Sequence, residues 1–258
     1  KKRGKLFYKL LFIFLIVSLL PLGIVSYYLV NLTQSTLNRS IIRDQEALAL
    51  AFADTVTNYV ISFRNILYDS SRLEDFYTMK TEKIKPLVSN MMQIHSAFLE
   101  ISVLNPLGQE VVRVSRFGED NSLRDFLNSS VYQKTVKDGE FIGNFERYNG
   151  TYPSITIAVS IVNPRNPSYT SGVIMAKLSL ATLSGLLKAS FPDPQHTKVA
   201  VIDNNGYIIA SSVPSEAEKP KAKLNDEVLK ILLNNDAKSG GGEISYSSGQ
   251  KVLGALVR

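Results

Sequence analysis

The side chains best suited to holding a small molecule are concentrated between Arg116 and Thr156. Guanidinium groups there can hydrogen-bond an anion in pairs, and hydroxyl groups and aromatic rings can line a pocket. The candidate ligand-binding residues are Arg116, Arg124, Tyr132, Asn144, Arg147, Tyr148, Tyr152, Ser154 and Thr156. As a set they suit a small polar solute, particularly one with an anionic group. The alternative is that the arginines are solvated and the tyrosines border a core.

Groups suited to catalysis are scarce. His95 and His196 each lack a second ligand at metal-binding spacing, so both are interpreted as packed or solvated. The chain has no Cys nucleophile, no G-x-S-x-G elbow and no Walker loop. The run Gly240–Gly242 is interpreted as a flexible turn before a strand. We therefore expect no catalytic residue, no metal and no cofactor.

The most apolar stretch, Leu10–Val30, contains no charged residue. About 20 such residues in a helix match the thickness of a bilayer core. A cleaved signal peptide is the alternative, but its apolar core would be shorter and would end in a small-x-small site, which is absent. Short basic flanks stay in the cytoplasm. We expect a cytoplasmic flank over 1–9, a transmembrane helix over 10–30, and the rest, after about Asn31, outside the inner or plasma membrane.

The charge balance argues against a nucleic-acid partner. The flank holds five of the 29 Lys and Arg residues, and the remainder nearly equals the 23 Asp and Glu residues. A nucleic-acid-binding domain would carry its basic residues on the folded part. The absence of Cys excludes a disulfide framework.

Helical spacing continues after the span, and we expect one helix from Gln34 to Ser71 in a stalk and connection over 31–85. Residues three, four or seven apart form an apolar stripe: Leu37, Ile41, Leu48, Phe52, Val56, Tyr59, Phe63 and Ile66. This stripe must be covered by the chain's own domain, by a second copy in a homodimer, or by each along a different part.

The next section predicts an α+β unit. Helices are expected over Leu87–Ala97 with Pro86 as first residue, over Ser129–Lys137 with Asn128 or Ser129 as cap and Gly139 as stop, and over Ala181–Ala189. Strands are expected over Leu99–Val103, Gln109–Val114, Glu140–Phe145, Ser154–Ile161 and Gly172–Leu178. In the strand from Ser154, one face is expected to be core and the other small and polar.

After a linker at Phe191–Pro194 the scheme repeats. Strands over Lys198–Ile202 and Tyr207–Ser211 flank the turn Asp203–Gly206, followed by a helix over Asp226–Leu233 and strands over Glu243–Tyr246 and Val252–Val257. Val103–Val112 aligns with Val201–Ala210, which indicates an internal repeat. The second unit has one strand fewer, so we expect a further strand and a second membrane span beyond Arg258.

This order of elements resembles the double Cache domain, a tandem of PAS-like modules found outside the membrane in bacterial and archaeal receptors. The resemblance covers Gln34–Arg258 and is carried by Leu99–Ser115, Val131–Phe145, Ser154–Ile161, Ser171–Leu187 and Val199–Ser212. It implies an α+β fold with a membrane-distal, ligand-binding module over 86–190 and a truncated membrane-proximal module over 191–258. In that family the distal module usually holds a small ligand between its sheet and the overlying loop and helix.

We therefore predict the extracytoplasmic sensory domain of a membrane receptor, which binds a small solute and relays a conformational change to a cytoplasmic histidine kinase. Its partners would be the solute, the lipid bilayer and a second copy of the stalk. Alternatives are the sensor of a chemotaxis receptor or of a cyclic-dinucleotide enzyme, a membrane-anchored exported enzyme, and an adhesion module. The fragment itself is expected not to be an enzyme.

Overall fold

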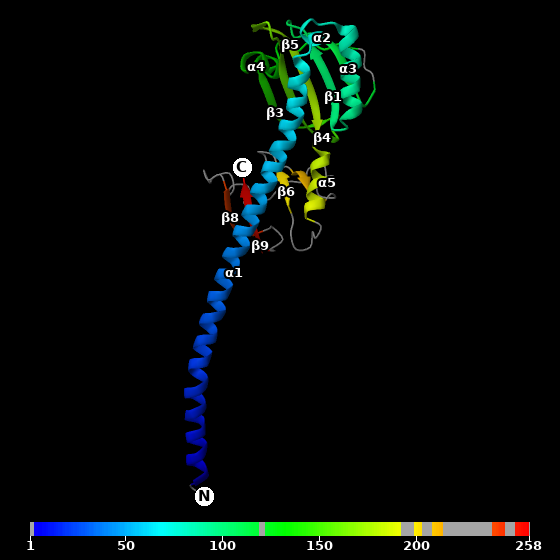
Figure 1. Cartoon of the computed structure of the whole chain (residues 1–258). Coiled ribbons are helices and arrows are strands. Elements are labelled where there is room, and N and C mark those ends of the chain that lie inside the picture. The colour runs from blue at the N-terminus through cyan, green and yellow to red at the C-terminus, as the bar shows by residue number, and fades with distance from the viewer. Residues whose placement is uncertain are drawn as a thin grey trace. The chain divides into compact units, whose positions relative to one another are not determined.

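The computed structural model describes residues 3–118, 122–191, 199–202, 208–213, 239–245 and 251–257. The chain forms two units, one made of Lys1–Ala53 with Lys230–Arg258 and the other of Asp54–Leu229 (Figure 1). Several predicted features lie outside the described residues: most of the linker Phe191–Pro194, His196, the turn Asp203–Gly206 and the helix Asp226–Leu233.

The first unit contains most of helix α1, which runs from Arg3 to Ser71 and ends in the second unit. Within the described residues, one helix, at Val17–Ser71, is long and apolar enough to cross a membrane. All described side chains between Leu11 and Gln34 are exposed, as a lipid-facing helix requires. Pro21 lies inside this helix, a position that membrane helices tolerate.

The first unit also contains an antiparallel hairpin of β8 (Ser239–Ser245) and β9 (Lys251–Val257). The predicted flexible turn at Gly240–Gly242 is wrong, because these glycines lie within β8 and pair with residues 254–256 of β9. The apolar partner strand supplies the backbone pairing that outweighs the low strand preference of glycine.

The second unit is built on a five-stranded antiparallel sheet. Its strands are β1 (Phe98–Leu104), β2 (Glu110–Ser115), β3 (Glu140–Tyr148), β4 (Tyr152–Asn163) and β5 (Asn166–Ser179), in the order β2-β1-β5-β4-β3. A tight turn joins β3 to β4, with positive φ angles of 51° at Asn149 and 72° at Gly150. All five strands were predicted from the sequence, and the α+β class is confirmed.

Among the described residues, four helices follow α1: α2 (Glu74–Tyr77), α3 (Thr81–Ile94), α4 (Ser130–Asp138) and α5 (Ala181–Ser190). The predicted ends of α4 are confirmed. The Ser129 side chain accepts a hydrogen bond from the Tyr132 amide, and Gly139 ends the helix at a φ of 86°. The predicted start of α3 at Pro86 is wrong, because the helix begins five residues earlier and places Ile84 in the core.

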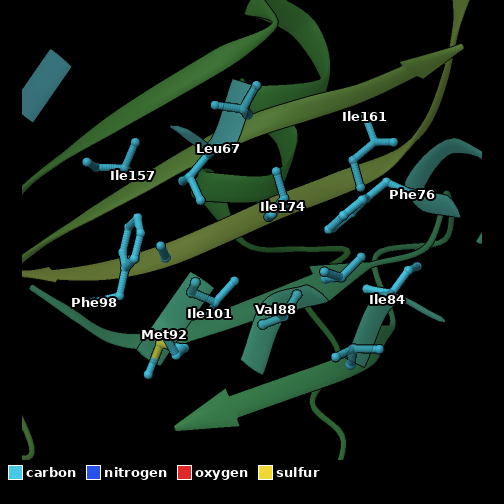
Figure 2. Close-up of a cluster of buried hydrophobic side chains, with 14 of the residues drawn as sticks. Leu67, Phe76, Ile84, Val88, Met92, Phe98, Ile101, Ile157, Ile161 and Ile174 are labelled. Carbon is cyan, nitrogen blue, oxygen red and sulfur yellow. The ribbon is translucent and has the colours of Figure 1, made fainter. Parts of the chain in front are cut away.

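One face of the sheet carries the main hydrophobic core. Leu67 of α1, Phe76 of α2 and residues Ile84, Val88 and Met92 of α3 pack against it, as Figure 2 shows. The sheet contributes Phe98, Ile101, Ile157, Ile161 and Ile174 from β1, β4 and β5. This packing fixes the end of the long helix against the three inner strands, β1, β5 and β4.

The opposite face is also covered, so the prediction that the Ser154 side of β4 is merely small and polar is incomplete. At one end of this face, Phe126, Val131, Tyr132 and Phe141 pack on Leu104, Ala158, Val173 and Met175. At the other end, Ser154 and Thr156 are buried although they are polar. We call these ends the apolar half and the polar half of the second face.

The apolar stripe of α1 divides along its length. Tyr59, Val60, Phe63 and Ile66 pack against the main core, which confirms that the chain's own domain covers this part. In contrast, Leu37, Ile41 and Leu48 are exposed. Tyr59 also donates a hydrogen bond to the Ser179 carbonyl at 2.9 Å, so α1 is tied to the end of β5.

The second unit ends, among its described residues, with a small hairpin of β6 (Ala200–Ile202) and β7 (Ile208–Ser211). Helix α5 lies against β7, and the Ser211 amide donates to the Ser184 hydroxyl at 3.4 Å. The predicted strands of this hairpin are therefore present, while the predicted module over 191–258 stays a prediction.

The docking of α1 gives the first testable prediction. Leu67 is completely buried, so Leu67→Ala should lower the free energy of unfolding by about 2–5 kcal/mol through a cavity and lost apolar burial. Denaturant unfolding of the purified chain in mild detergent, followed by circular dichroism, measures this change. The control is Leu186→Ala on α5, an exposed leucine whose loss should cost less than about 0.5 kcal/mol. Equal effects of the two substitutions would contradict the packing.

Candidate ligand-binding site

The polar half of the second face is an unusual concentration of charge on a covered sheet. In register, Glu100 of β1 lies opposite Ser115 of β2 and Lys177 of β5, and Lys177 lies opposite Thr156 of β4. Because side chains alternate along a strand, these residues share one side of the sheet, away from the main core. Glu100 and Thr156 are buried.

An arginine joins two buried carboxylates in this region. Arg124 contacts Glu100 Oε1 and lies 3.0 Å from Glu110 Oε1, and its backbone amide donates to Glu110 Oε2 at 3.1 Å. The Ser102 hydroxyl donates to Glu110 Oε1 at 2.6 Å. Arg113 is the second cation near Glu110, at 3.8 Å. Burial lowers the pKa of Arg124, but hydrogen bonds with Glu110 and Glu100 outweigh this effect and raise the pKa. The Arg124 guanidinium between the two carboxylates is therefore always protonated.

The tip of the β3–β4 hairpin bends over this network. Although β5 and β4 separate β3 from β1, the Tyr148 hydroxyl donates to Glu100 Oε2 at 2.7 Å. It also lies 3.4 Å from the Ser115 hydroxyl. Phe117 packs beside it, with its ring centroid 5.6 Å from that of Tyr148 and 4.6 Å from that of Tyr152. These three rings, the aromatic rim, border the carboxylate network.

A second polar cluster adjoins the first on β3, β4 and β5. The Lys177 ammonium donates to Glu146 Oε1 at 2.5 Å and to the Thr156 hydroxyl at 2.8 Å. The Ser154 hydroxyl donates to the Glu146 carbonyl at 3.3 Å. Since Lys177 is the cross-strand neighbour of Glu100, the two clusters form one continuous polar surface.

The charges of the polar half balance. Glu100, Glu110 and Glu146 face Arg113, Arg124 and Lys177. Ion pairs on a covered face lose hydration, and a well-packed apolar set would often be equally stable or more so. Their concentration on a sheet that is otherwise apolar makes this half the candidate site of the described residues. Among the described residues, no three His, Asp or Glu side chains gather to hold a metal ion.

Several of the predicted ligand-binding residues do come together here. Arg124, Tyr148, Ser154 and Thr156 lie in the polar half, and Tyr152 lies in the aromatic rim. They originate from the connection after β2 and from strands β3 and β4, and their role in ligand binding stays a prediction.

Other members of the predicted set have different surroundings. The Arg116 guanidinium donates to the carbonyls of Met92, His95 and Phe98, which places it at the C-terminal end of α3. Tyr132 lies in the apolar half and donates to the Pro106 carbonyl at 2.8 Å. Asn144 is exposed on β3, and Arg147 donates to the Thr151 carbonyl within the hairpin.

The sequence reasoning missed Glu100, Glu110, Glu146, Lys177 and Phe117. The sequence did contain a signal for Glu100, because Glu100 and Ser102 are the two polar residues in the otherwise apolar strand Phe98–Leu104. The structure shows that every residue of this strand is buried. The position of Lys177 beside Glu100 depends on strand register, which the sequence does not reveal.

No family model matches the sequence, and the search of curated proteins found no match. Solved structures are similar in fold. The sensory domain of the Campylobacter jejuni chemoreceptor Tlp3 with isoleucine bound aligns with a TM-score of 0.64 at 15% identity, covering 86% of this chain and 89% of that one.

Two further solved structures belong to the same class. The extracellular domain of the putative histidine kinase mmHK1S-Z2 has a TM-score of 0.58 at 11% identity, covering 83% of this chain and 89% of that chain. The sensor domain of the V. cholerae histidine kinase DctB has a TM-score of 0.57 at 11% identity, covering 83% and 91%. The chain therefore has the fold of the extracytoplasmic sensory domains of chemoreceptors and histidine kinases, and the resemblance to the Cache type is confirmed at the level of the fold.

The Tyr148 contact predicts a pH effect. Burial, together with Glu100, raises the pKa of Tyr148 above the ordinary value of 10.0 and outweighs the opposing bond to Ser115. The folded state thus favours the neutral phenol, a stabilisation complete below about pH 10 and lost as the pH rises through the higher folded pKa. The difference in phenolate absorbance between the wild type and Tyr148→Phe should have a midpoint above that of the same chain unfolded in urea. A coincident midpoint would contradict the contact.

Proposed function

We propose that this chain is the sensory part of a membrane receptor and binds a small solute on the polar half of the sheet. The observation that carries the proposal is the covered, charge-balanced surface around Glu100, Glu110 and Lys177. It occupies one half of the second face of the sheet, and the first face carries the main hydrophobic core. Solved domains of this fold include one with isoleucine and one with GABA, which supports a ligand site of similar size.

Within the predicted set, Arg124, Tyr148, Tyr152, Ser154 and Thr156 are the residues that we assign to ligand contact. The other four predicted residues would not contact the ligand, since their described contacts or exposure place them away from the polar half. These are Arg116, Tyr132, Asn144 and Arg147. That an anionic group of the ligand binds Arg116 or Arg124 stays a prediction. The contacts weigh against it, because both guanidinium groups already face oxygen acceptors.

The relay would run through α1. This helix packs on the sheet near its C-terminal end and contains the predicted span over 10–30. We propose a histidine kinase as the output domain, with the sensor of a chemotaxis receptor as the second candidate, because sensory domains of both kinds share the fold. The domain boundaries at 31, 86 and 191 belong to the same proposal.

A ligand screen tests the sensory function. Compounds from several classes, including amino acids, organic acids, amines and sugars, should contain at least one that raises the unfolding temperature of the purified chain, because binding to the folded state stabilises it. Thr156→Val keeps the shape of the side chain while removing its hydroxyl. The affinity for a compound found in the screen should therefore fall about tenfold. Absence of any hit across the classes would argue against a solute sensor.

The exposed part of the α1 stripe predicts a homodimer contact. The chain contains no Cys, so a single introduced Cys reports on its own position. Ile41→Cys in the full chain, in membranes, should form an oxidised dimer readily, because Ile41 lies in the exposed apolar stripe. Arg43→Cys is the control, since two residues rotate the side chain by about 200° around the helix. Equal cross-linking at both positions would contradict pairing through this stripe.

A further inference from the structure

The carboxylates of Glu100 and Glu110 share one cation, the guanidinium of Arg124. Their side chains are 6% and 0% exposed, and both contact the guanidinium of Arg124. The Arg124 side chain is 38% exposed, and it comes from the connection between β2 and α4 rather than from the sheet. The acids are therefore fixed in the strands, while their shared partner is delivered from outside the sheet.

Arg124 belongs to a segment, residues 122–128, that we call the strap. The strap is held by short stretches of backbone pairing. The Glu110 amide donates to the Arg124 carbonyl at 2.9 Å, and the Phe126 amide donates to the Gly108 carbonyl at 2.8 Å. An isolated bridge joins Gln109 to Asp125. In the described part of the strap, these backbone bonds act together with the packing of Phe126 in the apolar half and the ion pairs of Arg124. Loss of the ion pairs would therefore weaken one of the strap's three kinds of attachment.

The charge balance decides which ligand group could enter. With Arg124 in place, the three acids of the polar half face three cations. If Arg124 leaves, one negative charge is uncompensated, and an entering monocation restores neutrality. An anion that approached Arg124 would instead meet Glu100 and Glu110 at short range and would add an unbalanced charge to a covered surface.

The surroundings of Glu100 also suit a cation. Tyr148 donates to its Oε2 and thereby fixes the carboxylate, while Phe117 and Tyr152 complete the aromatic rim. Ring faces attract ammonium and guanidinium groups, and a carboxylate beside such rings supplies the charge partner. The Arg124 guanidinium itself lies 5.3 Å from the centre of the Phe126 ring, a contact of the same kind.

We propose that Glu100 and Glu110 recognise the cationic group of the solute, a small ammonium or guanidinium compound, and that Arg124 is an internal cation which the solute displaces. The inference rests on the proposed sensory function and names its ligand class. It also gives a conformational response, because the departure of Arg124 removes the ion pairs that hold the strap. The displaced segment precedes α4, which covers the other half of the same face.

Calorimetric titration of the purified chain with methylguanidine, propylamine and propionate distinguishes the charge classes. Arg124→Gln should tighten the binding of the two cations about tenfold, because the competing internal cation is gone. Glu100→Gln should weaken them about tenfold or more. Arg165→Gln, in the exposed turn between β4 and β5, is the matched control and should change neither.

The opposite pattern overturns the inference. If propionate binds and Arg124→Gln abolishes that binding, Arg124 is an anion contact, and the sensory function survives without this ligand class. Absence of cation binding at millimolar concentration also overturns it, whereas failure of every class in the ligand screen would instead overturn the sensory function.

A measurement on the wild type covers the case in which Arg124→Gln does not fold. Saturation with methylguanidine should speed hydrogen exchange at the Phe126 amide, which is bonded to the Gly108 carbonyl in the strap. Exchange at the Val103 amide in the central strand β1 is the reference, because that strand is buried throughout and should remain protected. Unchanged or slower exchange at Phe126 would show that the strap is not released, and the proposal would be wrong.

Discussion

The ion pairs of Arg124 with Glu100 and Glu110 determine how the second face of the sheet is organised. Both carboxylates are buried, so a charge partner is needed to offset the hydration that each has lost. Supplying that partner from the connection after β2 positions this connection over the sheet and sets Phe126 into the apolar half. One pairing therefore separates the face into a packed end and a polar end.

The fold was largely predictable because its signals are local. The alternation in β1 and β4, the Asn149–Gly150 turn, and the cap and stop of α4 are each encoded in a few neighbouring residues. The exceptions followed tertiary contacts: α3 begins early because Ile84 is needed in the core, and Gly240–Gly242 extends because β9 pairs with it. Propensity alone does not decide such cases.

The site was predictable only in part, for a similar reason. Residue type pointed to the stretch that supplies Arg124 and Tyr148 to the polar half, but type could not separate Arg124 from Arg116. One guanidinium satisfies helix-end carbonyls and the other satisfies carboxylates. That difference depends on where α3 ends and on how β1 and β2 pair. The acids themselves were missed because their neighbours lie on other strands.

The two faces of the sheet meet in the same two strands, which gives the proposed relay a physical basis. On β1, Phe98 packs against Phe63 of α1 with ring centroids 5.2 Å apart, while Glu100 projects to the polar half. On β5, the Ser179 carbonyl accepts the Tyr59 hydroxyl of α1, while Lys177 projects to the polar half. Because covered strands are densely packed, a change in the pairing of Glu100 or Lys177 would displace strand residues only two positions away. Those residues, Phe98 and Ser179, contact α1, the helix that leads toward the membrane.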